Sequence, residues 1–377
     1  MFNFIAPQQY SNVYTFIMCT LSFIMAFYRA PSPNNSKLIV SYKPFSQGFA
    51  WFLLISTIFF IGWRPVSGWF GDMTLYSHIY ENFYGDWTYD NERGEYLFYW
   101  FGEMCKQSGL SVNNYFLIIA TVYFGLMAAT CWRLMRRDLL LALIFCFVSF
   151  SCFAYGTNGV RNGMACSIAM FALTFMTSSI IERIIAVILM FAAYEIHKTT
   201  ALPSICAIIA FYLIKDPKYA IGFWVASIFI SFLAGSFITD FFVSLGFDDR
   251  LEQYSNTIEN NEIQLTLDPI SGFRMDFLIY SAAPIIMAWY VTVKRNFKDH
   301  MYNIFVITYI LSNAFWVIVI RSSFSNRFAY LSWFLYPIVI AYPLLRMNIW
   351  EDQDRKTAMI LLAYSGFTFF MNFVYYA

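Results

Sequence analysis

The stretch Gly156-Thr-Asn-Gly-Val-Arg161-Asn-Gly-Met-Ala-Cys-Ser-Ile-Ala-Met-Phe-Ala-Leu-Thr-Phe175 reads as a membrane span that opens with an arginine. Crossing about 30 Å of hydrocarbon takes roughly 17–20 apolar residues, and stretches of this kind recur along the whole chain. The sequence is 59% apolar and only 12% charged, too little charge for the surface of a soluble protein of 377 residues. The sequence therefore predicts an all-α polytopic membrane protein.

Apolar runs bounded by charged or turn residues predict about twelve transmembrane helices. These lie near residues 12–28, 47–63, 113–132, 138–155, 161–178, 182–196, 199–214, 219–237, 274–293, 301–320, 327–345 and 357–375. The first lacks a basic leader and a small-residue cleavage site, so we expect it to be retained. We expect the whole chain, 1–377, to form a single integral membrane domain.

Lysine and arginine are unequally divided between alternate loops, with fifteen in one set and nine in the other, which together make up the 24 in the chain. The positive-inside rule places the richer set in the cytoplasm and both termini on the outer face. Two long loops, about 64–112 and 238–273, then face outward. In the first, four-residue spacing of Leu75 with Ile79 and of Tyr76 with Tyr80 predicts an amphipathic helix in the membrane interface. We expect both long loops to carry short interfacial helices.

Five arginines fall at the predicted outer boundary of the hydrocarbon. They are Arg64, Arg161, Arg274, Arg321 and Arg327. Any one of them could extend to lipid phosphates, but five at the same depth indicate a binding site for an anion.

Arg161 carries this argument furthest. A cation in the first turn of a helix opposes the helix dipole by roughly 0.3–1 kcal/mol, whereas a bound anion would reverse the penalty. Thr157 or Asn158 is a suitable N-cap for this helix. The neighbouring glycines that would let a ligand approach the backbone are Gly156, Gly159 and Gly163. A phosphate-sized anion at the outer face is the expected ligand.

Three residues are candidates for acid–base chemistry. His197 lies in a tight turn on the predicted outer face, and Asp72 and Glu95 lie in the first outer loop. Each also has a structural interpretation, because a single histidine at a helix end usually packs and loop carboxylates are usually solvated. Asp72 is favoured over Glu95 because it follows Gly71 at the start of the interfacial helix.

Several classes of function are not supported. The chain has no P-loop, no GxGxxG and no other nucleotide signature, and its net charge of +1 does not indicate a nucleic-acid partner. Its seven cysteines include no CxxC, and the adjacent Asp248 and Asp249 lack the spacing of a DxD motif, so we expect neither a metal nor a cofactor. If the protein is a transferase, we therefore expect its donor to be an activated molecule carried in the membrane rather than a nucleotide.

Two motifs resemble a known family. Gly159-Val-Arg161-Asn-Gly-Met-Ala165 and Ile196-His197-Lys198-Thr199 resemble the G-[IV]-R…A and H-K-[ST] signature of the EpsG/Wzy family of bacterial exopolysaccharide and O-antigen polymerases. The resemblance extends over about residues 50–345. It includes Arg64, Gly71-Asp72 with Tyr76, Glu95-Tyr-Leu-Phe, Gly272-Phe-Arg274 and Arg327-Phe-Ala-Tyr330. Asn162 stands where a glutamine is expected.

The resemblance implies a GT-C-like glycosyltransferase of the bacterial inner membrane with its active site facing the periplasm. It would join undecaprenyl-diphosphate-linked oligosaccharides, serving as donor and acceptor, into O-antigen or a related glycan, by inversion and without a metal. Arg161, Arg321 and Arg327 would stabilise the diphosphate, while Asp72, Glu95 or His197 would be the base. His197 would equally serve to hold the diphosphate.

Further roles follow from the same resemblance. The residues expected to bind diphosphate or glycan also include Arg64, Arg274, Tyr76 and Tyr330, and we expect a Wzz-type chain-length co-polymerase as a partner. A transporter or flippase of lipid-linked oligosaccharide is a rival interpretation, although it would need charges along the middle of its spans, which are nearly absent here. The motifs are also compatible with an O-antigen ligase or a membrane O-acyltransferase.

Overall fold

A computed structural model describes residues 4–29, 43–82, 95–244, 274–320 and 326–375. Every regular element in these ranges is a helix, as predicted. Contacts divide the chain into two compact units, the first formed by Met1–Thr200 with Ile340–Ala377 and the second by Ala201–Val339. The expectation of a single membrane domain stays a prediction.

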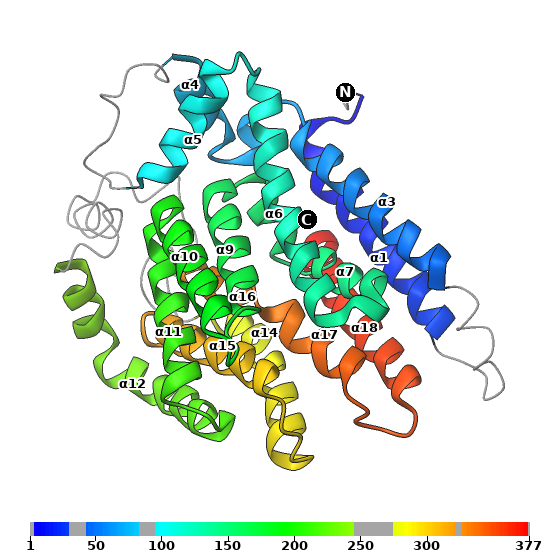
Figure 1. Cartoon of the computed structure of the whole chain (residues 1–377), viewed down its shortest axis with the longest axis vertical. Coiled ribbons are helices and arrows are strands. Elements are labelled where there is room, and N and C mark those ends of the chain that lie inside the picture. Colours follow the sequence, from blue (N-terminus) through cyan, green and yellow to red (C-terminus); the bar gives the residue numbers. More distant parts are fainter. Residues whose placement is uncertain (1–3, 30–42, 83–94, 245–273, 321–325, 376–377) are drawn as a thin grey trace. The chain divides into compact units, whose positions relative to one another are not determined.

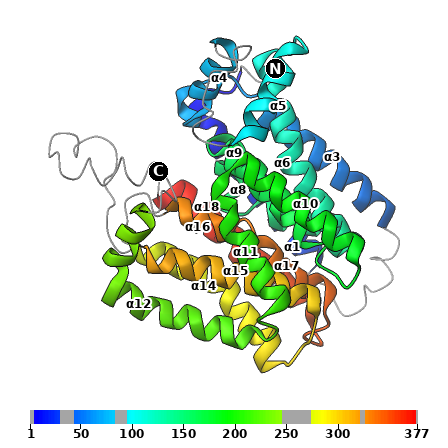
Figure 2. The same cartoon turned by 60° about the vertical axis from the view of Figure 1, so that its left-hand side comes forward.

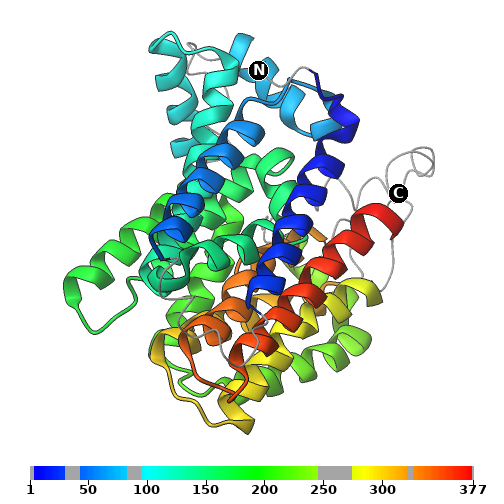
Figure 3. The same cartoon turned by 90° about the vertical axis from the view of Figure 1, so that its right-hand side faces the viewer.

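The first unit is a bundle in which α6 contacts α3 on one side and α9 on another, and α9 in turn packs against α10 (Figure 1). Its helices are α1 (Tyr10–Arg29), α3 (Lys43–Gly62), α4 (Met73–Asn82), α5 (Tyr96–Gln107), α6 (Val112–Met135), α7 (Leu139–Phe147), α8 (Cys152–Thr157), α9 (Val160–Leu173), α10 (Ile180–Ile196) and α18 (Gln353–Phe370). Figure 3 shows α1, in dark blue, lying beside α18, in red.

The chain between α6 and α9 differs from the prediction. We expect a span over 138–155, but α7 has only 9 residues and α8 only 6. At 1.5 Å per residue α7 is about 14 Å long, too short to cross a bilayer. All of its residues are buried, and it contacts α1, α3 and α6. The run is therefore apolar because it lies in the protein interior, and predicting it as a span is wrong.

The second unit is arranged around α15 (Figure 2). Its helices are α11 (Ala201–Tyr212), α12 (Pro217–Ser244), α14 (Met275–Ala288) with a π-helical extension (Trp289–Lys294), α15 (His300–Ile318) and α16 (Asn326–Trp333), and α17 (Tyr336–Arg346) begins there and ends in the first unit. α15 contacts α11, α12, α14 and α16. It is apolar on nearly all sides, as expected of a helix with neighbours all round it.

The structure supports a multi-pass membrane protein. Among the described residues, six stretches are long and apolar enough to cross a membrane. They are Pro7–Arg29, Val112–Phe147, Met275–Lys294, His300–Ile318, Phe328–Arg346 and Gln353–Tyr375. Each of the twelve predicted segments contains helix, but twelve separate spans are not confirmed. On α10, exposed apolar residues such as Ile184, Ile188 and Phe191 form a surface suited to lipid.

The predicted interfacial helix of the first long loop is present as α4, which begins directly after Asp72. Tyr76, Ile79 and Tyr80 are buried and Leu75 is 48% exposed, so the aromatic side of the helix faces the protein. Its position in a membrane interface stays a prediction. In the second long loop, α12 extends to Ser244, and the remainder lies outside the described residues.

Candidate functional site

Three of the predicted site residues lie together in the first unit, each at the end of a different helix. Glu95 is the N-cap of α5, Arg161 is the second residue of α9, and His197 is the C-cap of α10. α10 packs against both α5 and α9, which brings the three ends together. We call Glu95, Arg161 and His197 the Glu95 cluster.

The Glu95 carboxylate is the centre of this cluster. One oxygen, Oε2, accepts a hydrogen bond from Arg161 Nη1. The other, Oε1, lies 2.7 Å from His197 Nδ1 and accepts a bond of 3.2 Å from the backbone N–H of Lys198. An ionised carboxylate can only accept, so the proton of this His197 contact is on Nδ1. In the neutral ring, Nε2 is then the basic nitrogen.

The cluster is largely shielded from solvent. The side chains of Arg161 and Glu95 are 8% and 7% exposed, while that of His197 is 20% exposed. The pKa of Glu95 reflects these surroundings. Burial alone would raise it, but the hydrogen bond from His197 and the charge of Arg161 outweigh the effect of burial and lower the pKa to about 2. Glu95 is therefore ionised throughout the physiological pH range.

Arg161 has further contacts with aromatic residues. Its Nη1 also donates to the hydroxyl of Tyr99 over 3.3 Å, and its guanidinium carbon lies 6.0 Å from the ring centre of Tyr76 and 5.9 Å from that of Phe98. Among the described residues, the buried Nε of Arg161 has no hydrogen-bond partner. The guanidinium is thus fixed through Nη1, while the hydrogen-bonding capacity of Nε is unused among the described residues.

Asp72 is positioned near Arg161 by a contact between two loops. The backbone N–H of Asp72 donates to Asn158 Oδ1 over 3.1 Å, just before α9 begins. Gly71 has φ of 59°, and a Cβ there would lie 2.1 Å from Asn158 Oδ1, so this contact needs a glycine. The Asp72 charge interacts with that of Arg161, but the carboxylate bonded to both Arg161 and His197 is Glu95.

The expected N-cap of α9 is wrong. Thr157 ends α8, and its hydroxyl donates to the carbonyl of Phe153; the residue at the N-cap is Gly159. Two of the glycines serve packing rather than ligand access. A Cβ on Gly163 would lie 2.5 Å from the carbonyl of Tyr155, and one on Gly156 would lie 3.3 Å from Ile61.

The hydrogen bonds of Arg64 go to residues outside the cluster, and 1% of its surface is exposed. Its Nη1 and Nη2 each donate over 2.7 Å to a backbone carbonyl, those of Ile61 and Thr157, and its guanidinium lies over the ring of Phe70. These contacts connect the end of α3 to the end of α8. The geometry favours a structural role, while the binding role of Arg64 stays a prediction.

The remaining predicted binding residues belong to the second unit or lie outside the described residues. Arg274 forms a bidentate pair with Asp276, with contacts of 2.9 and 2.6 Å. Tyr330 is in α16, its ring centre 5.4 Å from that of Trp333. Arg327 is also in α16, and Arg321 lies outside the described residues. The roles of all four stay predictions.

Sequence reasoning named Asn158 only as a possible N-cap, and it did not identify Tyr99 or the backbone N–H of Lys198 as parts of the site. Tyr99 had a detectable signal, because it follows Glu95 by four residues and therefore shares its face of α5. The other two depend on how distant loops meet. Within the described residues no three His, Cys, Asp or Glu side chains gather at metal-binding distance, and the metal-independent reaction stays a prediction.

The comparison with protein-family models agrees with the two motifs. A search of curated proteins and a search of solved structures each found no match. The model of the EpsG family matches residues 47–377, which is most of the chain and includes the whole Glu95 cluster. The chain therefore belongs to the EpsG family.

Proposed function

We propose that this protein is a polysaccharide polymerase that joins undecaprenyl-diphosphate-linked repeat units into O-antigen or a related surface glycan. The observation that carries the proposal is the Glu95 cluster, in which a buried carboxylate contacts both an arginine and a histidine. Membership of the EpsG family adds support. The reaction would take place at the periplasmic face of the bacterial inner membrane, in a GT-C-like fold with up to twelve spans.

The proposed reaction is an inverting displacement at the anomeric carbon of the donor glycan. A hydroxyl oxygen of the acceptor sugar forms the new glycosidic bond as the bond to the diphosphate oxygen breaks. Undecaprenyl diphosphate leaves with the bonding electrons, and the hydroxyl proton passes to a base. No metal takes part in this scheme, so protein groups must supply the base and stabilise the leaving group.

His197 is the base in this proposal, with Glu95 as its positioning residue. The contact from Nδ1 to Glu95 selects the tautomer in which Nε2 accepts a proton, and it stabilises the imidazolium that results. Asp72 and Glu95 fit the role less well. Glu95 is held as an anion between two donors, and the carboxylate that orients His197 is that of Glu95 rather than that of Asp72.

Arg161 would stabilise the leaving diphosphate. Nη1 is engaged by Glu95 and Tyr99, while the buried Nε has no partner among the described residues and can donate to a phosphate oxygen. Tyr76, close to the same guanidinium, can contact a sugar or the lipid diphosphate. A Wzz-type protein remains the expected partner that sets chain length.

The surface-polysaccharide ladder of a deletion strain tests the function. Loss of a polymerase leaves lipid A core with a single repeat unit, whereas loss of a ligase or a flippase leaves no repeat unit and loss of an acyltransferase leaves the full ladder. Only the first pattern supports the proposal.

Complementation of that strain tests the site. His197→Gln should restore only the single repeat, because glutamine has no basic nitrogen. His78→Gln should restore the full ladder, because His78 is an exposed residue of α4 whose ring contacts Asn82, one turn further along the same helix. A full ladder with His197→Gln would exclude His197 as the base.

A further inference from the structure

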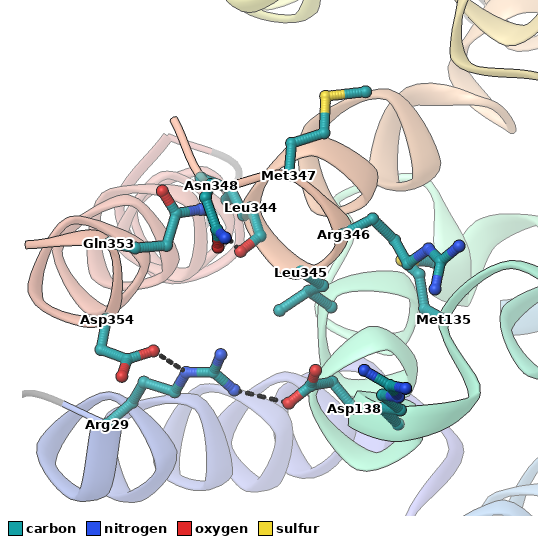
Figure 4. Close-up of a pocket in the computed structure, with 11 residues that line it drawn as sticks. Arg29, Met135, Asp138, Leu344, Leu345, Arg346, Met347, Asn348, Gln353 and Asp354 are labelled. Atoms are coloured by element: carbon teal, nitrogen blue, oxygen red, sulfur yellow. Dashed lines mark hydrogen bonds and ion pairs between the residues drawn. The ribbon is translucent and has the colours of Figure 1, made fainter. Parts of the chain in front are cut away.

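A polar cavity of about 360 Å³ lies in the first unit, away from the Glu95 cluster (Figure 4). It is formed where α1, α17 and α18 meet the turn between α6 and α7. None of its lining residues belongs to the Glu95 cluster, and α6 ends at Met135, which lines the cavity. The 24 residues of α6 measure about 36 Å, close to the thickness of a bilayer.

Three arginines and two aspartates line this cavity, so its lining carries a net charge of +1. Arg29 bonds to both aspartates, with contacts of 2.8 Å to Asp138 and 2.8 Å to Asp354. Figure 4 shows the guanidinium of Arg29 between the two carboxylates. The acidic groups are thereby engaged with one arginine, and the other two arginines account for the excess positive charge.

The two other arginines are Arg137, in the turn before α7, and Arg346, the last residue of α17. Both are exposed, and neither forms an ion pair among the described residues. The cavity also has an apolar wall that includes Met135, Leu344 and Leu345. Two available cations beside an apolar wall match a ligand with an anionic head and a hydrophobic body.

We propose that this cavity binds the phosphate head group of an anionic phospholipid in the membrane leaflet opposite the Glu95 cluster. Arg29, Arg137 and Arg346 come from three loops of the lysine- and arginine-rich set, the set that the positive-inside rule places in the cytoplasm. An anionic leaflet is found on that side of the membrane. A free phosphate ion would use the same arginines but would gain nothing from the apolar wall.

Native mass spectrometry of the purified full-length protein tests the proposal, with phosphatidylglycerol as the probe and phosphatidylcholine as the uncharged comparison. The wild type should retain phosphatidylglycerol preferentially. Each arginine near an anionic head group contributes roughly a fivefold factor, so the double variant Arg137→Gln/Arg346→Gln should lose that preference by roughly thirtyfold. Arg136→Gln is the matched control, because Arg136 is an exposed neighbour in the same turn that does not line the cavity.

The outcomes separate clearly. Equal retention of the two lipids by the wild type, or an unchanged preference in the double variant, would overturn the proposal. Complete displacement of phosphatidylglycerol by excess inorganic phosphate would also overturn it, because the site would then recognise the ion alone. The melting temperature of the double variant shows whether it is folded, and its surface exposure predicts that it is.

Discussion

Glu95→Gln is the sharpest test of the Glu95 cluster, because it removes one charge while keeping the shape of the side chain. The variant leaves Arg161 buried without its anion and places an amide donor where the carboxylate accepted. Lowering the pKa of Glu95 from 4.5 to about 2 corresponds to about 3 kcal/mol of stabilisation. Removing one partner of a buried ion pair typically costs about 3–5 kcal/mol, a range that includes the value obtained from the pKa of Glu95.

This loss should lower the melting temperature of the purified protein by roughly 4 °C. The melting temperature can be measured by intrinsic tryptophan fluorescence in detergent. Glu103→Gln is a closely matched control. Glu103 is on the same helix α5, its exposed fraction is 6%, equal to that of Glu95, and it accepts a hydrogen bond from Gln107 without an ion pair. Its variant should melt within about 1–2 °C of the wild type, because the lost hydrogen bond contributes about 1 kcal/mol.

The effect of pH follows from the direction of the shift. The folded pKa of Glu95 is depressed, so its stabilisation is complete above the ordinary value of 4.5 and is lost as the pH falls toward about 2. The gap in melting temperature between the wild type and Glu95→Gln should therefore be present at neutral pH, where the carboxylate is ionised, and narrow below about pH 4. Equal melting temperatures of the two proteins at neutral pH would refute a buried ion pair at this position.

Three further substitutions test neighbouring contacts. Arg161→Lys should reduce polymer formation in the complemented strain by about a hundredfold, since a lysine cannot keep both hydrogen bonds made by Nη1 and also supply Nε; a normal ladder would contradict this. Gly71→Ala should lower the melting temperature more than Gly109→Ala, because both have positive φ but only Gly71 faces an atom, Asn158 Oδ1, within 4 Å. Arg64→Gln should reduce stability by about 2–3 kcal/mol and leave the activity of the folded fraction unchanged, whereas lost activity at an unchanged melting temperature would favour the ligand role.

The helical class was predictable from hydropathy, but the number of spans was not. All twelve predicted segments contain helix, because long apolar runs can satisfy their backbone hydrogen bonds internally in this way. Hydropathy does not distinguish a side chain facing lipid from one facing another helix. α7 is as apolar as a span, yet each of its residues is buried in the protein. Distinguishing the two requires the packing of α1, α3 and α6 around it.

The members of the site were predictable, whereas their relationships were not. Arg161, Glu95 and His197 were all candidates. The cation at the helix N-terminus predicted a bound phosphate-sized anion, and that ligand stays a prediction. The anion that the structure places beside Arg161 is the carboxylate of Glu95, which the sequence separation of 66 residues concealed. Glu95 ranked below Asp72 because a loop carboxylate is usually solvated, but Glu95 is the N-cap of a packed helix and is 6% exposed.

The charges of the cluster also explain why its histidine suits the role of a base. The N-terminus of α5 favours the anion of Glu95, and the C-terminus of α10 favours a cation on His197. Only Arg161 opposes its helix dipole, by roughly 0.3–1 kcal/mol, and the pair with Glu95 exceeds that. With neutral His197 the cluster has no net charge. In the proposed reaction, uptake of the acceptor proton would make it positive as the departing diphosphate becomes more negative, so the two changes stabilise each other.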